Sequence, residues 1–218
     1  MIKIDKLTKS FGKRTVLNEI SVEIPDDSIT AFIGESGSGK TTILNLISMV
    51  DHDFEGDIIV DDKSLKDISK KQYEKKRVMM FSYVFSNAFL LPYLSIVDNI
   101  LLPTRFGKQK VDSQKLEDYI SYFKMDFLLK SKVDSLSEGE KQRVAILRAL
   151  AYNRKYIICD EPTAHLDPEN AKLTFELLKD ISRKYHKTVI VSLHDYSSIA
   201  LFDSVWKIQD GKLHEIKQ

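Results

Sequence analysis

The segment "GESGSGKTT" at residues 34–42 combines glycines, small hydroxyl residues and one lysine at a spacing suited to binding an anion. It fits the pattern G-x-x-x-x-G-K-[ST] and lies between a run typical of a buried strand and one typical of a helix. Backbone N–H groups of such a turn, aligned with a helix N-terminus, form a concave site for phosphates. Gly37 and Gly39 permit dihedrals that a Cβ disfavours. Lys40 would supply a point charge for the β- and γ-phosphates, and the Thr41 hydroxyl can bind Mg²⁺.

Two adjacent carboxylates follow another apolar run in "YIICDE". We expect Asp160 to hold Mg²⁺ directly or through water, and Glu161 to orient or deprotonate an attacking water as a general base. Because adjacent carboxylates repel each other, a cation close to one of them makes the pair tolerable. The alternative interpretation is that both acids only cap the following helix.

His194 ends the apolar run "TVIVSLH". If this strand neighbours the one before the phosphate-binding loop, its imidazole can hydrogen-bond the γ-phosphate. The alternative is an ordinary polar residue at a strand end.

An amphipathic helix is predicted within "DSLSEGEKQRVAILRAL", residues 134–150, and Ser137 and Gly139 lie at its entrance. Ser137 and Glu140 have the spacing of a capping box, in which both side chains satisfy free backbone N–H groups. From this segment alone, the capping box is sufficient explanation for the residues.

The elements that must position these residues alternate between buried strands and helices, which predicts an α/β fold with a mostly parallel sheet. A hairpin is expected to turn at Asp210 and Gly211. The helix-rich segment from about 86 to 150 interrupts the alternation and is interpreted as an inserted lobe of a single domain spanning 1–218, with a core formed by about 1–85 and 151–218. The expected strands are 16–24, 28–34, 56–60, 77–85, 154–162 and 187–195; the expected helices are 41–50, much of 95–130, and 167–185.

Composition excludes several classes of protein. The net charge is +1, and no concentrated basic face indicates a nucleic-acid partner. The densest basic run, residues 70–77, is interpreted as the solvated side of a helix, with contact to a partner or an anionic surface as the alternative. The single cysteine, Cys159, cannot form an internal disulfide, which fits a reducing compartment. Without a signal peptide or an apolar run of about 20 residues, the chain is expected to be cytoplasmic, with any membrane role supplied by a partner.

Five motifs in order resemble the nucleotide-binding subunit of an ATP-binding-cassette (ABC) transporter, and the resemblance covers essentially the whole chain. They are the phosphate-binding loop, "LSEGEKQR", "YIICDEP", "AHLD" and the histidine of "SLHD". The resemblance implies a P-loop NTPase core with an antiparallel β region and an inserted helical subdomain. It also implies an ATPase that works with Mg²⁺, a second ATP-binding subunit and a membrane-spanning permease, on the inner face of the membrane.

In this family two subunits pack head to tail, and each ATP lies between the phosphate-binding loop of one and the signature helix of the other. Carried over, Ser137 and Gly139 would contact the γ-phosphate held by a partner copy, and Asp167 would lie at the dimer seam. Phe11 matches an aromatic that stacks on adenine, although it could equally be a core residue. The residues implied to bind ATP within one chain are Phe11, Gly34, Ser36, Gly37, Ser38, Gly39, Lys40, Thr41 and Thr42, with Glu161 and His194 as catalytic residues.

Two positions depart from the family pattern. Ser86 occupies the place of a glutamine that reaches Mg²⁺ and the attacking water, and a serine can meet the metal only through a water. Glu138 replaces the first signature glycine, which is unfavourable near a triphosphate unless its carboxylate turns away or pairs with a cation such as Lys141. Both departures predict reduced hydrolysis or altered coupling, with little effect on nucleotide binding.

Within the family, "ESGSGKTTILNLISMVD" and "NAFLLPYLSIVDNILLP" resemble the bacterial branch of lipoprotein-release, macrolide-efflux and peptide or bacteriocin export subunits. The expected permease contact is the surface around residues 86–106, unless its apolar residues only pack the inserted lobe. Two alternatives stay open: an ABC ATPase that works without a membrane, and a weakly hydrolysing, ATP-responsive regulatory dimer.

Overall fold

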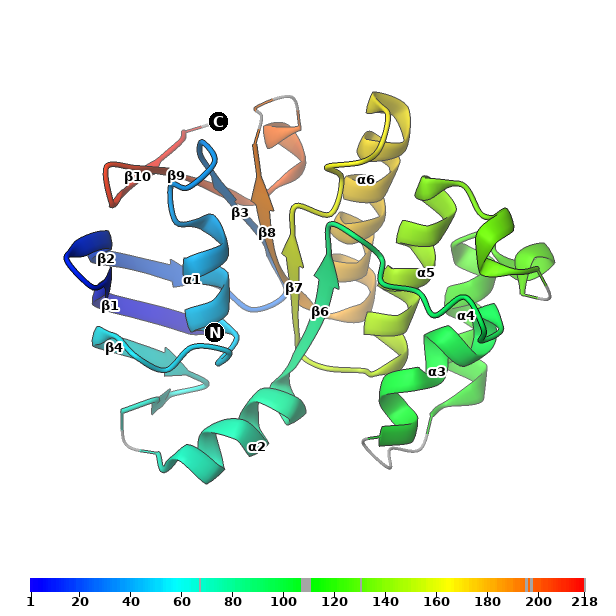
Figure 1. The fold of residues 1–218 in the computed structure, drawn as a ribbon, viewed down its shortest axis with the longest axis horizontal. Coiled ribbons are helices and arrows are strands. Elements are labelled where there is room, and N and C mark those ends of the chain that lie inside the picture. The colour runs from blue at the N-terminus through cyan, green and yellow to red at the C-terminus, as the bar shows by residue number, and fades with distance from the viewer. Residues whose placement is uncertain (67, 107–110, 130, 195, 197, 218) are drawn as a thin grey trace.

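Two β-sheets and the helices around them form the molecule, and one sheet is parallel apart from an edge strand (Figure 1). The computed structural model describes residues 1–218 except 67, 107–110, 130, 195, 197 and 218. The larger sheet has the order β10-β9-β3-β8-β7-β6. Its strands are β3 (Ile29–Ile33), β6 (Phe81–Phe85), β7 (Tyr156–Asp160), β8 (Thr188–Leu193), β9 (Ser204–Gln209) and β10 (Lys212–Glu215).

The parallel strands carry the expected site residues to one edge of this sheet. The pairs β6–β7, β7–β8, β3–β8 and β3–β9 are all parallel, so their carboxyl ends lie together. The residues that directly follow β3, β7 and β8 are Gly34, Glu161 and His194. The predicted α/β fold with a mostly parallel sheet is therefore confirmed, as is the hairpin between β9 and β10.

The smaller sheet is antiparallel and has the order β2-β1-β4-β5. It consists of β1 (Ile2–Phe11), β2 (Arg14–Ile24), β4 (Glu55–Val60) and β5 (Lys63–Ser64). This sheet is the expected antiparallel region. Its inner face packs with α1 (Lys40–Ile47) in one apolar cluster, which fixes the helix that follows the phosphate-binding loop.

A second apolar cluster runs from the other face of the parallel sheet into the helices. These are α3 (Ile96–Phe106), α4 (Ser113–Tyr122), α5 (Glu138–Ala151) and α6 (Pro168–Tyr185), with short 3-10 turns at Asp126–Leu128, Val133–Ser135 and Ile199–Leu201. Cys159 is fully buried in this cluster, as expected of a core residue, and burial raises the pKa of its thiol. The proposed division at about residues 86 and 150 stays a prediction.

The strand expected at residues 77–85 is partly wrong. Residues 77–80 form the last turn of α2 (Lys70–Met80), and β6 begins only at Phe81. The capping box of Ser69 and Gln72 starts α2, and the helix continues to Met80 although residues 78–80 are apolar enough for a strand. β2 also begins two residues earlier than expected, and β1 was not expected as a strand. Part of the helical expectation for 95–130 falls on residues 107–110 and 130, which lie outside the described chain.

The described helices include none with the combination of length and apolarity required to cross a bilayer.

Candidate functional site

At three positions of the loop between β3 and α1, the backbone accommodates only glycine. Gly37 and Gly39 have φ values of 77° and 109°, in the region that favours glycine. Gly34 is needed for a different reason, because a Cβ there would lie 2.6 Å from Ser38 Oγ and 2.8 Å from the Ile208 carbonyl oxygen. The glycines predicted from the motif are therefore required by the fold of the loop itself.

The start of α1 offers donors to an anion. Within the described residues no side chain caps this helix, so its first N–H groups are not used by the protein. The Ser38 hydroxyl in the same loop is also buried without a hydrogen-bond partner in the described chain. A pocket of about 250 Å³ opens here, and its lining combines the loop and the start of α1 with two residues of β2 and the residues that directly follow β7 and β8: Arg14, Val16, Ser36, Gly37, Gly39, Lys40, Thr41, Thr42, Glu161 and His194.

Lys40, Glu161 and His194 form one cluster beside this pocket. Lys40 is 4% exposed, and its Nζ donates to the carbonyl oxygens of Gly34 at 2.8 Å and Glu35 at 3.1 Å. The same Nζ lies 3.4 Å from Glu161 Oε1, and His194 Nε2 lies 2.7 Å from Glu161 Oε2. Three predicted residues from three different elements are therefore within hydrogen-bond or ion-pair distance of one another.

Thr41 and Asp160 provide the oxygen donors that Mg²⁺ prefers. The Thr41 hydroxyl donates to Asp160 Oδ1 at 3.3 Å. Mg²⁺ is usually held by one or two carboxylate or hydroxyl oxygens together with substrate phosphates and waters, so this donor set fits the ion. No cluster of three or more His, Cys, Asp or Glu side chains suited to a metal occurs in the described chain. The two oxygens are therefore suited to a metal that arrives with a phosphate ligand.

Ser192 connects Asp160 with Glu161, and it was not predicted from the sequence. Its hydroxyl, fully buried in β8, donates to Asp160 Oδ1 at 2.6 Å and accepts from the Glu161 backbone N–H at 2.9 Å. Glu161 has a φ of 49°, an unfavourable left-handed conformation for a glutamate. One serine thus fixes the carboxylate expected to hold Mg²⁺ and holds the strained backbone of the candidate base.

The signature helix α5 begins with the predicted capping box. The Glu140 backbone N–H donates to Ser137 Oγ at 3.3 Å, and Glu140 Oε2 accepts from the Ser137 N–H at 2.8 Å. Ser137 is exposed, and Glu138 forms an ion pair of 2.7 Å with Lys141, the cation suggested for it. The carboxylate of Glu138 is therefore partly neutralised by its own helix.

Gly139 is buried against α6. A Cβ on Gly139 would lie 2.8 Å from the Asn170 side-chain oxygen, while Asn170 Nδ2 donates to Asp167 Oδ2 at 2.7 Å. These hydrogen bonds from Asn170 lower the pKa of the exposed Asp167 carboxyl and make it the cap of α6. The proposed seam residue and the signature motif are thus joined through one asparagine. Neither Ser137 nor Gly139 lines the described pocket beside the phosphate-binding loop of its own chain.

Two other predicted residues lie near the site with fewer contacts. Phe11 is 55% exposed and is not a core residue, and Lys9 Nζ lies 4.9 Å from the centre of its ring. Ser86 directly follows Phe85, which pairs with Asp160 in parallel register, so it lies at the same sheet edge as Glu161. Adenine stacking by Phe11 and metal contact by Ser86 stay predictions.

A model of the family described as "ABC transporter" matches residues 17–164, about two-thirds of the chain, which include the phosphate-binding loop, Asp160, Glu161 and the start of α5. The chain belongs to the ABC transporter family. It is an ATP-binding subunit and an ATPase.

Two curated relatives and one solved structure illustrate the range of the match. The chain is 31% identical over its whole length to the "Lipoprotein-releasing system ATP-binding protein LolD" of Leptospira interrogans (serogroup Icterohaemorrhagiae serovar Lai), covering 92% of that protein. It is 37% identical, over 99% of its length, to the "Methionine import ATP-binding protein MetN" of Clostridioides difficile, covering 68% of that protein. A dimeric post-hydrolysis structure of the ATP-binding cassette MJ0796 with ADP and Pi has a TM-score of 0.83 and 30% identity, covering 100% and 98% of the two chains.

Arg14 is a second residue of this ABC cassette that sequence reasoning missed. Its guanidinium donates to the Gly37 carbonyl oxygen at 3.5 Å and lines the pocket beside the phosphate-binding loop. Arg14 pairs with Phe11 across the β1–β2 hairpin, so recognition of β1 would have placed it there. Ser192 had a clearer signal. It lies two residues before His194, and side chains two apart along a strand point to the same face.

We expect Ser192→Ala to lower the kcat for ATP about tenfold while changing KM less than about twofold, because the lost hydroxyl positions Asp160 and Glu161 rather than contacting ATP. Steady-state ATP hydrolysis at several Mg²⁺ concentrations measures the effect, and the variant should need more Mg²⁺. Ser182→Ala is the matched control, since that buried hydroxyl has no partner in the described chain. Equal kcat values for Ser192→Ala and the unaltered protein would contradict the role.

Proposed function

We propose that this ABC ATPase drives a separate membrane-spanning permease, and that two cassettes close head to tail around ATP to do so. Ser137 of one copy then reaches the γ-phosphate that Lys40 of the other copy holds. The proposal is supported by the exposed position of Ser137 and by the dimeric form of the MJ0796 cassette. Closure uses the N–H groups and positive dipole end of α5, which its capping box leaves partly available.

Within each site the chain's own residues divide the chemistry. The loop N–H groups and Lys40 hold the triphosphate, and Glu161 accepts the proton of the attacking water or orients it. His194, already 2.7 Å from Glu161, holds the carboxylate and can donate to the γ-phosphate. Thr41 and Asp160 would hold Mg²⁺, which neutralises charge developing on the transferred phosphoryl group. Hydrolysis and phosphate release then remove the ligand that joins the two copies.

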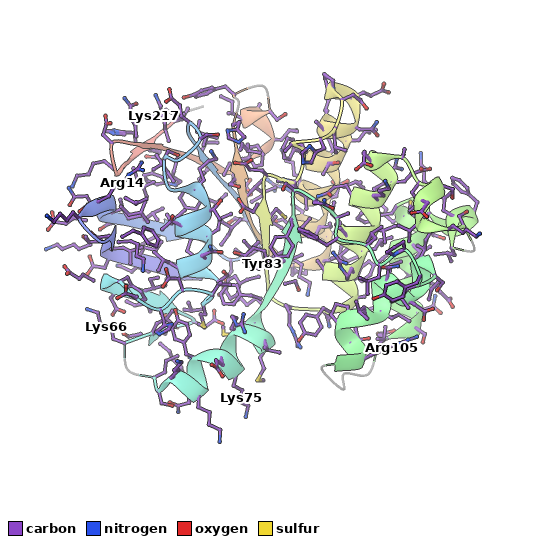
Figure 2. The ribbon with its side chains drawn as sticks, viewed as in Figure 1. Arg14, Lys66, Lys75, Tyr83, Arg105 and Lys217 are labelled. Carbon is purple, nitrogen blue, oxygen red and sulfur yellow. The ribbon has the colours of Figure 1, made fainter. Side chains whose placement is uncertain are left out.

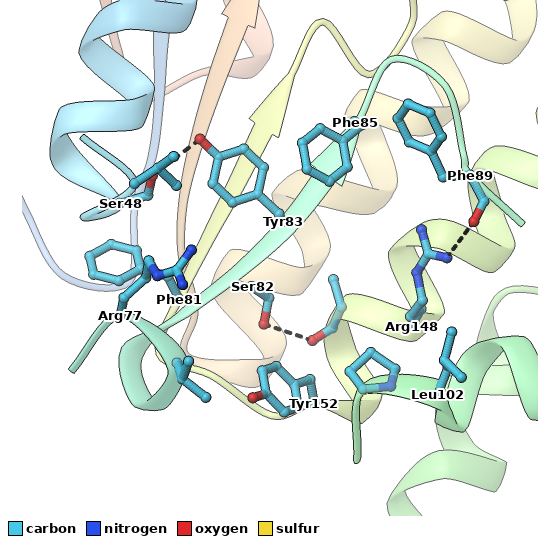
Figure 3. Close-up of a pocket in the computed structure, with 14 residues that line it drawn as sticks. Ser48, Arg77, Phe81, Ser82, Tyr83, Phe85, Phe89, Leu102, Arg148 and Tyr152 are labelled. Atoms are coloured by element: carbon cyan, nitrogen blue, oxygen red, sulfur yellow. Dashed lines mark hydrogen bonds between the residues drawn. The ribbon is translucent and has the colours of Figure 1, made fainter. Parts of the chain in front are cut away.

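The observation that carries the permease proposal is an apolar pocket between the parallel sheet and α3 (Figure 3). Its volume is about 520 Å³, and its lining includes Tyr83 and Ser48, the residue that ends α1 at the opposite end from the phosphate-binding loop. Three of its lining residues, Phe89, Leu102 and Pro103, belong to the segment 86–106 where permease contact was expected. Its lining includes Val50, Val78, Phe81, Phe85, Phe89, Leu102 and Pro103, together with Arg77, Arg148 and Tyr152.

Phe89 is held at the rim of this pocket in an unfavourable conformation. Its φ is 45°, and its side chain is 61% exposed. Arg148 stabilises this turn by donating to the carbonyl oxygens of Phe89 at 3.0 Å and Ala88 at 2.5 Å. A positive φ is unfavourable for a bulky residue, and it persists only where the surrounding structure stabilises it. A partner that buries the ring would supply a favourable interaction at this position.

We expect Phe89→Asp to lower binding of the purified cassette to membranes that contain the permease by about tenfold or more, since a central aromatic dominates such interfaces. Sedimentation with salt-washed membranes measures the bound fraction. Phe127→Asp is the matched control, because Phe127 is also highly exposed but lies in the turn after α4, outside the pocket. Unchanged binding of Phe89→Asp would exclude the pocket as the permease contact.

The finer part of the proposal is export of a peptide, lipid or antibiotic-like substrate by a complex whose cassettes lie on the inner face of the membrane. It is supported by the two sequence stretches resembling the export branch and by the lipoprotein-releasing relative. The similarity to methionine-import proteins favours the opposite direction of transport. The weakly hydrolysing regulatory dimer remains the second candidate, because Ser86 and Glu138 depart from the family pattern.

Ser86→Gln tests whether the departure at position 86 limits ATP hydrolysis, as the regulatory-dimer candidate requires. We expect the longer amide to reach the metal and the attacking water and to raise the rate of ATP hydrolysis several-fold. Steady-state phosphate release from the purified protein measures the rate, with Ser86→Asn as the control of shorter reach. An unchanged rate in Ser86→Gln would show that this position does not limit turnover.

A further inference from the structure

The outward face of α2 combines lysines with exposed apolar side chains. Lys71, Lys75, Val78 and Met79 follow one another at spacings that place them on one side of a helix, opposite the buried Tyr73. Val78 and Met79 are exposed to 43% and 57%. Because Val78 and Met79 are adjacent, they form an exposed apolar patch beside the lysines, and such a patch is suited to a partner.

The cations of α2 are not neutralised by the protein. Lys70, Lys71, Lys75, Lys76 and Arg77 share the helix with one acidic residue, Glu74. None of these six side chains forms an ion pair within the described part of the chain, whereas Lys9, Lys141 and Lys155 all do. Five unpaired cations on three turns of helix create a positive patch that complements an anionic surface.

The position of α2 beside the docking pocket indicates which anionic surface it can reach. Val78 and Arg77 line the pocket proposed to receive the permease, so the α2 face continues directly from that docking surface. Figure 2 shows Lys66 and Lys75 at the lower edge of the molecule, on the side opposite Lys217. A cassette attached through this pocket therefore presents α2 toward the membrane in which the permease lies.

We propose that α2 contacts the membrane surface itself, with its lysines on anionic lipid headgroups and Met79 in the interfacial layer, beside Val78 at the rim of the docking pocket. The orientation rests on the proposed permease contact, but the lipid affinity belongs to this chain alone. Basic residues near an anionic leaflet attract it over about a Debye length, and apolar side chains on the same helix add burial at the headgroup boundary. The contact would keep the cassette beside its permease between cycles of closure.

Flotation of the purified full chain with vesicles tests this directly. One set of vesicles contains phosphatidylcholine alone, and the other contains equal parts of phosphatidylcholine and phosphatidylglycerol. The chain should float with the anionic vesicles at least about tenfold more strongly than with the neutral ones, and high salt should weaken this binding. Equal binding to both kinds of vesicle, or none to either, would overturn the proposal.

A pair of charge-matched variants locates the contact. Lys71→Glu with Lys75→Glu should lower binding to anionic vesicles about tenfold or more, since each lysine near the surface contributes about fivefold. Lys212→Glu with Lys217→Glu, which makes the same charge change on and just after β10, should bind like the unaltered chain. Both double variants should retain the basal rate of ATP hydrolysis, which confirms that they fold. Equal losses in the two variants would show that only net charge matters and would overturn the assignment to α2.

The test of lipid binding can fail or succeed independently of the test of permease binding. Vesicles contain no permease, so loss of membrane binding in Phe89→Asp with retained vesicle binding supports both contacts independently. If the α2 variant binds vesicles normally but binds permease-containing membranes poorly, the partner of the patch is an acidic segment of protein and the lipid proposal is wrong.

Discussion

Replacing Glu161 with Gln should lower the steady-state rate of ATP hydrolysis by about two to four orders of magnitude while leaving ATP binding in place. The glutamine retains the size of the side chain but cannot accept a proton from water. It also removes the negative charge that faces Lys40 at 3.4 Å and His194 at 2.7 Å. Loss of that charge favours binding of the triphosphate, because Lys40 no longer divides its attraction between Glu161 and the phosphates.

Phosphate release under saturating ATP measures this effect, and titration with a non-hydrolysable ATP analogue measures affinity separately. Glu169→Gln, which makes the same change at an exposed position in the first turn of α6, is the control and should hydrolyse ATP at the unaltered rate. A rate for Glu161→Gln within about threefold of the control would mean that another group activates the water.

Lys40→Met should weaken ATP binding by about tenfold to a hundredfold, because charge-assisted hydrogen bonds contribute about 1.5–3 kcal/mol. Lys40 is buried, and two carbonyl oxygens of the loop fix its ammonium group. The methionine keeps the apolar stem but leaves Glu161 without its cation, so the pocket repels the triphosphate as well as losing a donor.

Calorimetric titration with the non-hydrolysable analogue measures the affinity of this variant. Lys3→Met is the control. It removes a cation paired with Glu23 across β1 and β2, and neither residue lines the pocket. Thermal unfolding of both variants distinguishes lost affinity from lost structure. Equal affinities of Lys40→Met and the control would contradict the assignment of the phosphate site.

Sequence reasoning succeeded where a backbone constraint and a chemical requirement coincide. Gly34, Gly37 and Gly39 are required by close contacts or positive φ, and Lys40 follows them at the start of a helix. The sheet edge shared by Glu161 and His194 followed from the alternation of buried strands and helices, which places carboxyl ends together. These features are encoded within short segments, so one sequence is sufficient to predict them.

The features that were not predicted from the sequence depend on contacts between segments distant along the chain. Residues 77–80 are apolar enough for a strand, but the helix started by Ser69 continues through them until Phe81 enters the sheet. β1 alternates weakly because its register with β2 shifts at several points. Ser192 lies two residues before His194, but its role comes from hydrogen bonds to Asp160 and Glu161 at the end of β7, a strand distant in sequence.

The signature motif illustrates a site that one chain leaves incomplete. Ser137 is bonded to Glu140 of its own helix, and Glu138 is paired with Lys141. Both contacts satisfy the helix start without any ligand, which is the simpler interpretation of the motif. Only the phosphate-binding loop of a second copy would give Ser137 and Gly139 a further partner.

If ATP joins two copies of this cassette, the mass in solution of the Glu161→Gln protein depends on the nucleotide present. The measurement compares the protein alone, with ATP and Mg²⁺, and with ADP and Mg²⁺. We expect a monomer in the first and third samples and a dimer only with ATP. A protein that binds ATP but retains the mass of a monomer would contradict closure between two copies of this chain.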